Sequence, residues 1–157
     1  MLTKYILIFF VSMVPIVELR GAIPIAAGWG LDYWTSLVVC VIGNMMPVPF
    51  IYFFARKVLH WGADKKYTRK FFRFCLEKGE RAGQKLMAKT GRGGLFVALM
   101  LFVGIPLPGT GAWTGTLAAS FLNMGIKTTA ASVSLGMIIA GIIMGVTSHT
   151  ALHVFGL

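Results

Sequence analysis

Two stretches of this sequence decide its fold: PIVELRGAIP at residues 15–24 and GIPLPGTGAW at residues 104–113. Each interrupts a long apolar run near its middle. Proline removes a backbone donor and clashes with the preceding turn, and glycine loosens a helix, so we expect both runs to break there. The first stretch also carries Glu18 and Arg20 at a depth where charge is costly. We interpret the two breaks as the functional centre of the chain.

The composition predicts an integral membrane protein with a single domain, 1–157. Charged residues make up only 13% of the chain, whereas ordinary soluble domains contain roughly 25%. Hydrophobic residues make up 57%, and the mean hydropathy is +0.78. We expect a multi-pass protein of a bacterial or archaeal cytoplasmic membrane. Residues 1–17 look like a signal peptide, but no small-x-small cleavage site precedes Pro15, so we expect them to be retained.

The formal charge of +10 is concentrated in one segment. From Arg56 to Arg92 there are twelve lysines and arginines against three acids. A basic loop between apolar blocks is typical of the cytoplasmic side of a membrane protein. Residues 57–94 are therefore predicted to be a basic amphipathic cytoplasmic helix, either continuous or interrupted near Gly79, that lies on anionic lipid or, as the alternative, covers the helix bundle as a solvated helix. No base-reading motif accompanies the charge, so we expect membrane lipids as partners and no nucleic acid.

The lengths of the apolar runs favour re-entrant hairpins. Residues 2–31 are too long for one straight crossing of about 20 residues and are broken in the middle. Two arms of about 12–14 residues would each rise roughly 18–20 Å, less than the ~30 Å of hydrocarbon. We therefore expect a hairpin that enters and leaves on one side. Residues 33–55 follow as a full span, in which the prolines after Asn44 predict a kink.

The second half repeats the order of the first, with a broken run at 95–124 and a full span at 128–146. With the basic segment inside, the two units, 5–56 and 95–147, have opposite orientations, as in many transporters. The predicted fold is an all-α integral membrane protein with two inverted repeats, each a re-entrant helical hairpin plus a transmembrane helix. In the alternative fold each broken run crosses completely, which makes four spans.

Glu18 and Arg20 are the candidate chemical groups of the first break. Two residues apart, they do not share a helix face, but in a broken stretch both can face one cavity. Glu18 is then a candidate proton carrier coupled to transport. Arg20 is a candidate anion contact, because its planar fork suits phosphate and carboxylate. The structural alternative is an ion pair that ties the tip to carbonyls freed by Pro15 and Pro24.

The second break offers backbone groups instead of charge. Helix N-termini and glycine-flanked N–H groups can hold anions, and threonine hydroxyls and an indole stand beside them. The alternative is tight packing of small residues. Asn44 on the neighbouring span needs a hydrogen-bond partner and could reach a tip. The predicted substrate-binding residues are Arg20, Gly21, Pro24, Asn44, Pro106, Pro108, Gly109, Thr110, Gly111 and Trp113.

The motifs ELRGAIP at 18–24 and PLPGTGAW at 106–113 resemble the small multidrug export proteins of bacteria and archaea. The resemblance covers nearly the whole chain and implies drug export. The layout is also similar to the DedA or VTT-domain superfamily, which implies paired membrane hairpins and movement of lipids, including undecaprenyl phosphate. DedA-like proteins carry an arginine near the second hairpin, whereas residues 95–124 contain no charge.

These observations predict a secondary transporter of a small molecule or lipid, coupled to protons through Glu18. No catalytic triad, phosphate-binding loop or metal cluster occurs, so we expect no enzyme, no cofactor and no metal. One alternative is a lipid or polyprenyl-phosphate flippase of DedA type. A second is a non-transporting scaffold that assembles through Gly141 and Gly145, whose G-x-x-x-G spacing allows two helices to pack closely. We expect a homo-oligomer, a dimer above all, because two hairpins and two spans barely enclose a cavity.

Overall fold

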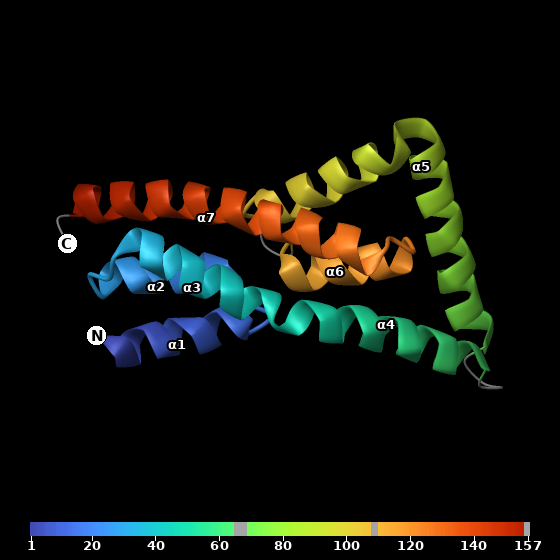
Figure 1. Ribbon diagram of the computed structural model, residues 1–157, viewed down its shortest axis with the longest axis horizontal. Coiled ribbons are helices and arrows are strands. Elements are labelled where there is room, and N and C mark those ends of the chain that lie inside the picture. Colours follow the sequence, from blue (N-terminus) through green and yellow to red (C-terminus); the bar gives the residue numbers. More distant parts are fainter. Residues whose placement is uncertain (65–68, 108–109, 156–157) are drawn as a thin grey trace.

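The protein is described by a computed structural model that covers residues 1–64, 69–107 and 110–155, and every element within these ranges is a helix (Figure 1). Two long apolar helical segments are each joined to a pair of shorter helices, and a basic helix stands across one end. The helices are α1 (Leu2–Met13), α2 (Glu18–Gly28), α3 (Tyr33–Met45), α4 (Pro47–Asp64), α5 (Arg69–Gly104), α6 (Ala112–Phe121) and α7 (Ile126–Phe155).

Both predicted breaks are present, and each joins two helices that run in opposite directions. Helix α1 ends at Met13, and Val14 is extended (φ −72°, ψ 127°), as expected for a residue that precedes proline. Helix α5 ends at Gly104, two residues before Pro106. In Figure 1 the α1–α2 pair opens toward one end of the molecule, and the pair made by α6 and the last turns of α5 opens toward the other. The two tips meet in the middle.

Two segments are long and apolar enough to cross a membrane: Tyr33–Val58 and Ile126–Ala151, each with a mean hydropathy of 2.0. The first comprises α3 and most of α4, which are separated at Met46, just before Pro47. The predicted kink after Asn44 is therefore confirmed. The apolar segment ends at Val58, three residues past the predicted end of the span at residue 55, whereas the helix itself continues to Asp64.

The distribution of side chains is that of a membrane protein. Large apolar side chains cover the outside, for example Phe50 (74% exposed) and Phe54 (69%). Small hydroxyl side chains, such as Ser12, Thr116 and Ser132, are fully buried between the helices. Apolar surface of this extent is unfavourable in water but suits the acyl chains of lipid.

The described part of the basic segment belongs to two helices, the end of α4 up to Asp64 and α5 from Arg69, and α5 is continuous to residue 90 with no interruption at Gly79. It turns at Gly91, whose φ of 68° lies in the left-handed region that glycine adopts at little cost. Beyond this turn the same helix becomes the first arm of the second tip. The basic helix and the apolar arm thus form α5 together, and the turn sets them at a steep angle to one another (Figure 1).

Glycines allow α7 to approach α3 closely within the chain. A Cβ atom on Gly141 would lie 2.2 Å from Leu37 Cδ1, and one on Gly145 would lie 2.2 Å from the Tyr33 ring. The Tyr33 hydroxyl donates to the Gly141 carbonyl at 3.1 Å. The close-packing pair predicted to join separate copies is therefore occupied by α3 of the same chain.

Candidate functional site

Glu18 begins α2 and reaches across to the start of α6. Its side chain is buried (6% exposed), and its Oε1 accepts a hydrogen bond from the Trp113 backbone N–H at 3.2 Å. The Ala112 N–H lies close enough to interact with the same carboxylate. The backbone of Glu18 is left-handed (φ 49°), a conformation that costs a residue with a Cβ about 1–2 kcal/mol. The contacts with α6 hold Glu18 in this unfavourable conformation.

Gly111 makes this contact possible. A Cβ atom built on Gly111 would lie 1.9 Å from Glu18 Oε2 and 2.4 Å from its carboxyl carbon. The backbone of Gly111 is extended (φ −149°), so any residue could adopt it. Glycine is required here for the space it leaves to the carboxylate.

Arg20 binds the end of α5. Its guanidinium donates to the Leu107 carbonyl, to the Ile105 carbonyl at 3.2 Å and to the Val103 carbonyl at 3.4 Å. It also donates to Thr110 Oγ1 at 2.9 Å. Val103 lies in the last turn of α5, where carbonyls have no donor within the helix, so the arginine supplies one. Ile105 and Leu107 follow the helix, and their carbonyls also accept from the Leu107 and Thr110 N–H groups.

The two charges of the first tip therefore complement the helix ends of the second. A helix carries partial positive charge at its N-terminus and partial negative charge at its C-terminus. Glu18 lies at the N-terminus of α6 and Arg20 at the C-terminus of α5. The two charges lie close enough to attract one another, but the hydrogen bonds of each side chain go to the second tip. The structural alternative drawn from the sequence predicted contacts with carbonyls near Pro15 and Pro24. Arg20 binds carbonyls of the second tip instead.

The second tip also donates a hydrogen bond to the first. The indole N–H of Trp113 donates to the carbonyl of Met13, the last residue of α1, at 3.2 Å. Thr114 Oγ1 accepts from the Gly111 N–H at 2.8 Å and steadies the start of α6. Each tip therefore makes hydrogen bonds to the other. We call these contacts, made by Glu18, Arg20 and Trp113, the lock.

Asn44 lies beside this lock. It is 1% exposed, and its Oδ1 has no hydrogen-bond partner among the described residues. Asn44, Glu18 and Arg20 line a cavity of about 10 Å³. A water molecule requires about 10–15 Å³ of such volume. The junction therefore has room for one water at most, and in this conformation it is closed to any larger molecule.

The remaining predicted residues lie at different distances from the lock. Gly21 packs at the start of α2, where a Cβ would lie 2.3 Å from Val17 Cγ1. Pro106 lies between two of the carbonyls that Arg20 binds. Pro24 lies farther along α2 and faces a separate pocket of about 360 Å³ beside α7. Pro108 and Gly109 fall outside the described residues.

N–H groups of the second break were predicted to hold an anion, but the individual contributing atoms were not identified from the sequence. They are backbone atoms, so residue type carries no direct signal for them: the carbonyls of Met13, Val103, Ile105 and Leu107 and the N–H of Ala112. The available clue was that all of them belong to helix ends next to a break, where unpaired groups are obligatory.

Comparison with known proteins places the chain in a family. The family model described as "Putative small multi-drug export protein" matches residues 18–143, from Glu18 of the first tip to the second half of α7. A search of curated proteins and a search of solved structures each found no match. The match covers both tips and most of the chain, so this membrane protein belongs to the small multi-drug export protein family.

Proposed function

We propose that the protein is a secondary transporter that exports small molecules, and that its two tips form a proton-operated gate. One observation carries the proposal: a buried carboxylate and a guanidinium from the first tip bind the helix ends of the second. Charged groups inside a membrane protein are costly and commonly mark pathways for ions or substrates. The family description, which names drug export, supports the same function.

The arrangement in the membrane is part of the proposal. Helices α1 and α2 have 12 and 11 residues, so each rises only about 17–18 Å, less than the ~30 Å of hydrocarbon. Both pairs are therefore re-entrant hairpins that enter from opposite sides, and each hairpin with its following span forms one of two inverted repeats. The basic segment 57–94 lies in the cytoplasm. The tips then meet near the midplane, where transporters of this kind bind and gate.

Protonation of Glu18 opens the gate in this mechanism. An ionised carboxylate makes charge-assisted hydrogen bonds to N–H groups, which are roughly twice as strong as neutral ones. A proton on Glu18 removes the charge that attracts the N-terminus of α6. The tips then separate, the left-handed backbone at Glu18 relaxes, and the guanidinium of Arg20 becomes available to an anionic group. Return of the carboxylate charge closes the junction again.

The test is flux in proteoliposomes under an imposed proton gradient, with ethidium as a cationic dye, carboxyfluorescein as an anionic dye and a fluorescently labelled phospholipid as a further cargo. Gradient-driven dye movement that Glu18→Gln abolishes supports the proposal. Full gradient-driven flux in Glu18→Gln would return Glu18 to a structural role. Lipid movement without dye movement would favour the flippase, and movement of neither would favour the scaffold. Native mass spectrometry in nanodiscs tests the proposed dimer. A monomer would count against it.

A further inference from the structure

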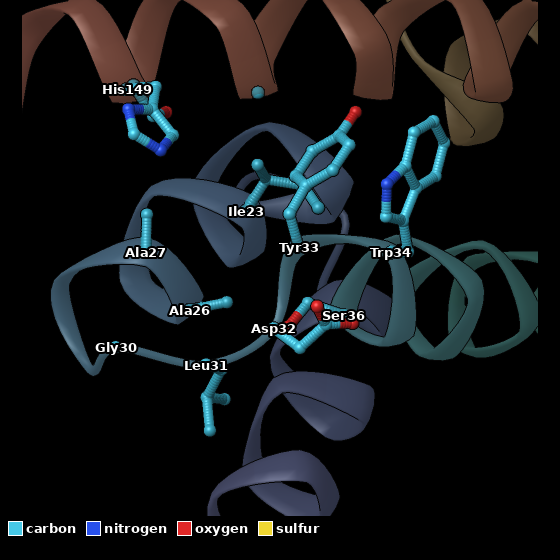
Figure 2. A pocket seen from close by; sticks show the side chains of 12 residues that line it. Ile23, Ala26, Ala27, Gly30, Leu31, Asp32, Tyr33, Trp34, Ser36 and His149 are labelled. Carbon is cyan, nitrogen blue, oxygen red and sulfur yellow. The ribbon is translucent and has the colours of Figure 1, made fainter.

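A second cavity lies away from the tips, where the α2–α3 connection meets the last turns of α7. It has a volume of about 470 Å³, within the range of about 300–1,000 Å³ that is usual for small-molecule sites. Figure 2 shows its walls: Ala26 and Ala27 of α2 on one side, the start of α3 on another, and His149 of α7 facing them. The small side chains of α2 leave the space open.

The lining of this cavity combines aromatic rings with a carboxylate. Tyr33 and Trp34 meet edge to face, with ring centroids 5.2 Å apart, and Trp34 is 67% exposed. Asp32 is exposed beside them, and hydrogen bonds from the N–H and hydroxyl of Thr35 hold the pKa of its carboxyl below its usual value. Asp32 is therefore ionised at neutral pH. Aromatic faces next to a carboxylate are the usual means of binding an organic cation.

A buried hydroxyl in the same wall needs a partner. Ser36 is 1% exposed and lines the cavity, and its Oγ has no hydrogen-bond partner among the described residues. Leaving such a group unpaired costs about 1–3 kcal/mol, so a ligand that satisfies it binds better. Its hydroxyl can donate or accept a hydrogen bond, and an ammonium attracted by Asp32 brings N–H groups that can donate to its oxygen.

The positive groups nearby do not compete for this site. Lys4, at the same end of the molecule, donates to the Trp29 carbonyl at 3.2 Å and does not line the cavity. Arg20 is engaged with the second tip. Among the residues that line the cavity, Asp32 is the carboxylate.

We propose that this cavity binds an organic ammonium with an aromatic or aliphatic body. The ammonium lies at Asp32 and donates to Ser36 Oγ, and the body lies against Tyr33, Trp34 and the small residues of α2. The ammonium belongs to a free solute or to a phosphatidylethanolamine headgroup, since both present the same chemistry. This adds a ligand class to the proposed export function, but binding at equilibrium does not depend on transport.

The test is a ligand-detected NMR titration of the whole protein in phosphatidylglycerol nanodiscs, with empty nanodiscs as the baseline. The probe is 2-phenylethylammonium, and 2-phenylethanol is its neutral match. Asp32→Asn keeps an N-cap residue on α3 and removes the charge. We expect it to weaken ammonium binding about two- to fivefold and to leave the alcohol unchanged. Equal changes for both probes, or none, would overturn the assignment.

Two further variants localise the site. Ser36→Ala should weaken the binding of 2-phenylethylammonium about three- to tenfold. It should leave the binding of the trimethylammonium analogue unchanged, because that ligand has no N–H to donate. Ala27→Phe fills the cavity and should abolish binding of all probes, whereas Ala131→Phe adds the same bulk at an exposed position of α7 and should not. Binding that survives Ala27→Phe would refute the location, and thermal melting confirms that each variant folds.

Two comparisons separate the ligand sources and the two proposals. If phosphatidylethanolamine added to the nanodiscs competes with the probe, the site takes a lipid headgroup; if it does not, the site takes a solute. Both results support ammonium recognition. A protein that binds the probe but moves no cargo would uphold this site and refute the proposed transport. Gradient-driven flux in a protein that does not bind the probe would uphold the proposed transport and refute this site.

Discussion

Replacement of Gly111 by alanine tests the lock between the tips most directly. The new methyl group would lie 1.9 Å from Glu18 Oε2, far inside van der Waals contact, so the carboxylate must move away from α6. The extended backbone of Gly111 accepts alanine without strain. In the folded protein the predicted effect therefore comes from the displaced carboxylate.

The expected loss follows from the contacts of Glu18. Buried hydrogen bonds to a charged group contribute about 1.5–3 kcal/mol. Alanine offsets about 0.4–1 kcal/mol of this by restricting the unfolded chain. The net destabilisation is about 0.5–2.5 kcal/mol, which for a chain of this size lowers the melting temperature by about 1–10 °C. The assay is thermal unfolding in nanodiscs followed by circular dichroism.

Two comparisons make the result decisive. Gly28→Ala is the matched control, because a Cβ there meets nothing within 4 Å, and it should melt at or slightly above the wild-type temperature. In the double variant with Glu18→Gln, the effects should be strongly non-additive, because both act on the same carboxylate. Wild-type melting of Gly111→Ala, or simple additivity, would refute the proposed contact.

Three other predictions concern single contacts. Arg20→Lys keeps the charge but loses the planar fork that reaches several carbonyls, and should lower stability by about 1–3 kcal/mol in the same melting assay. Trp113→Phe removes the donor to the Met13 carbonyl and should cost about 0.5–1.5 kcal/mol in the same assay. Asp32 has a pKa lowered by Thr35, so its stabilisation is present above its ordinary pKa and is lost as pH falls through the lowered value. Melting scans from pH 6 to pH 2 should therefore show an acid-side slope that Asp32→Asn reduces, and an unchanged slope would contradict this cap.

The local features of the fold could be predicted from the sequence. Proline acts on its own backbone, so the break after Met13 and the break before Pro106 follow from residue type alone. The separation of α3 from α4 before Pro47 has the same origin. Run length and hydropathy likewise marked the two long apolar segments. By contrast, the continuation of α4 to Asp64 was missed, because charged residues end a membrane crossing without ending a helix.

The partners of the site residues depended on the tertiary structure. Glu18 and Arg20 could be recognised as unusual because charge in an apolar run is costly whatever surrounds it. Their partners are backbone groups more than eighty residues away, and only the docking of one tip against the other determines which ones they meet. The same holds for Gly141 and Gly145, whose spacing predicts close packing but not with which helix. The sequence by itself thus determined where the helices break and where charge enters the membrane. The tertiary structure decided what those charges bind, because that depends on the distance between atoms that the chain does not place side by side.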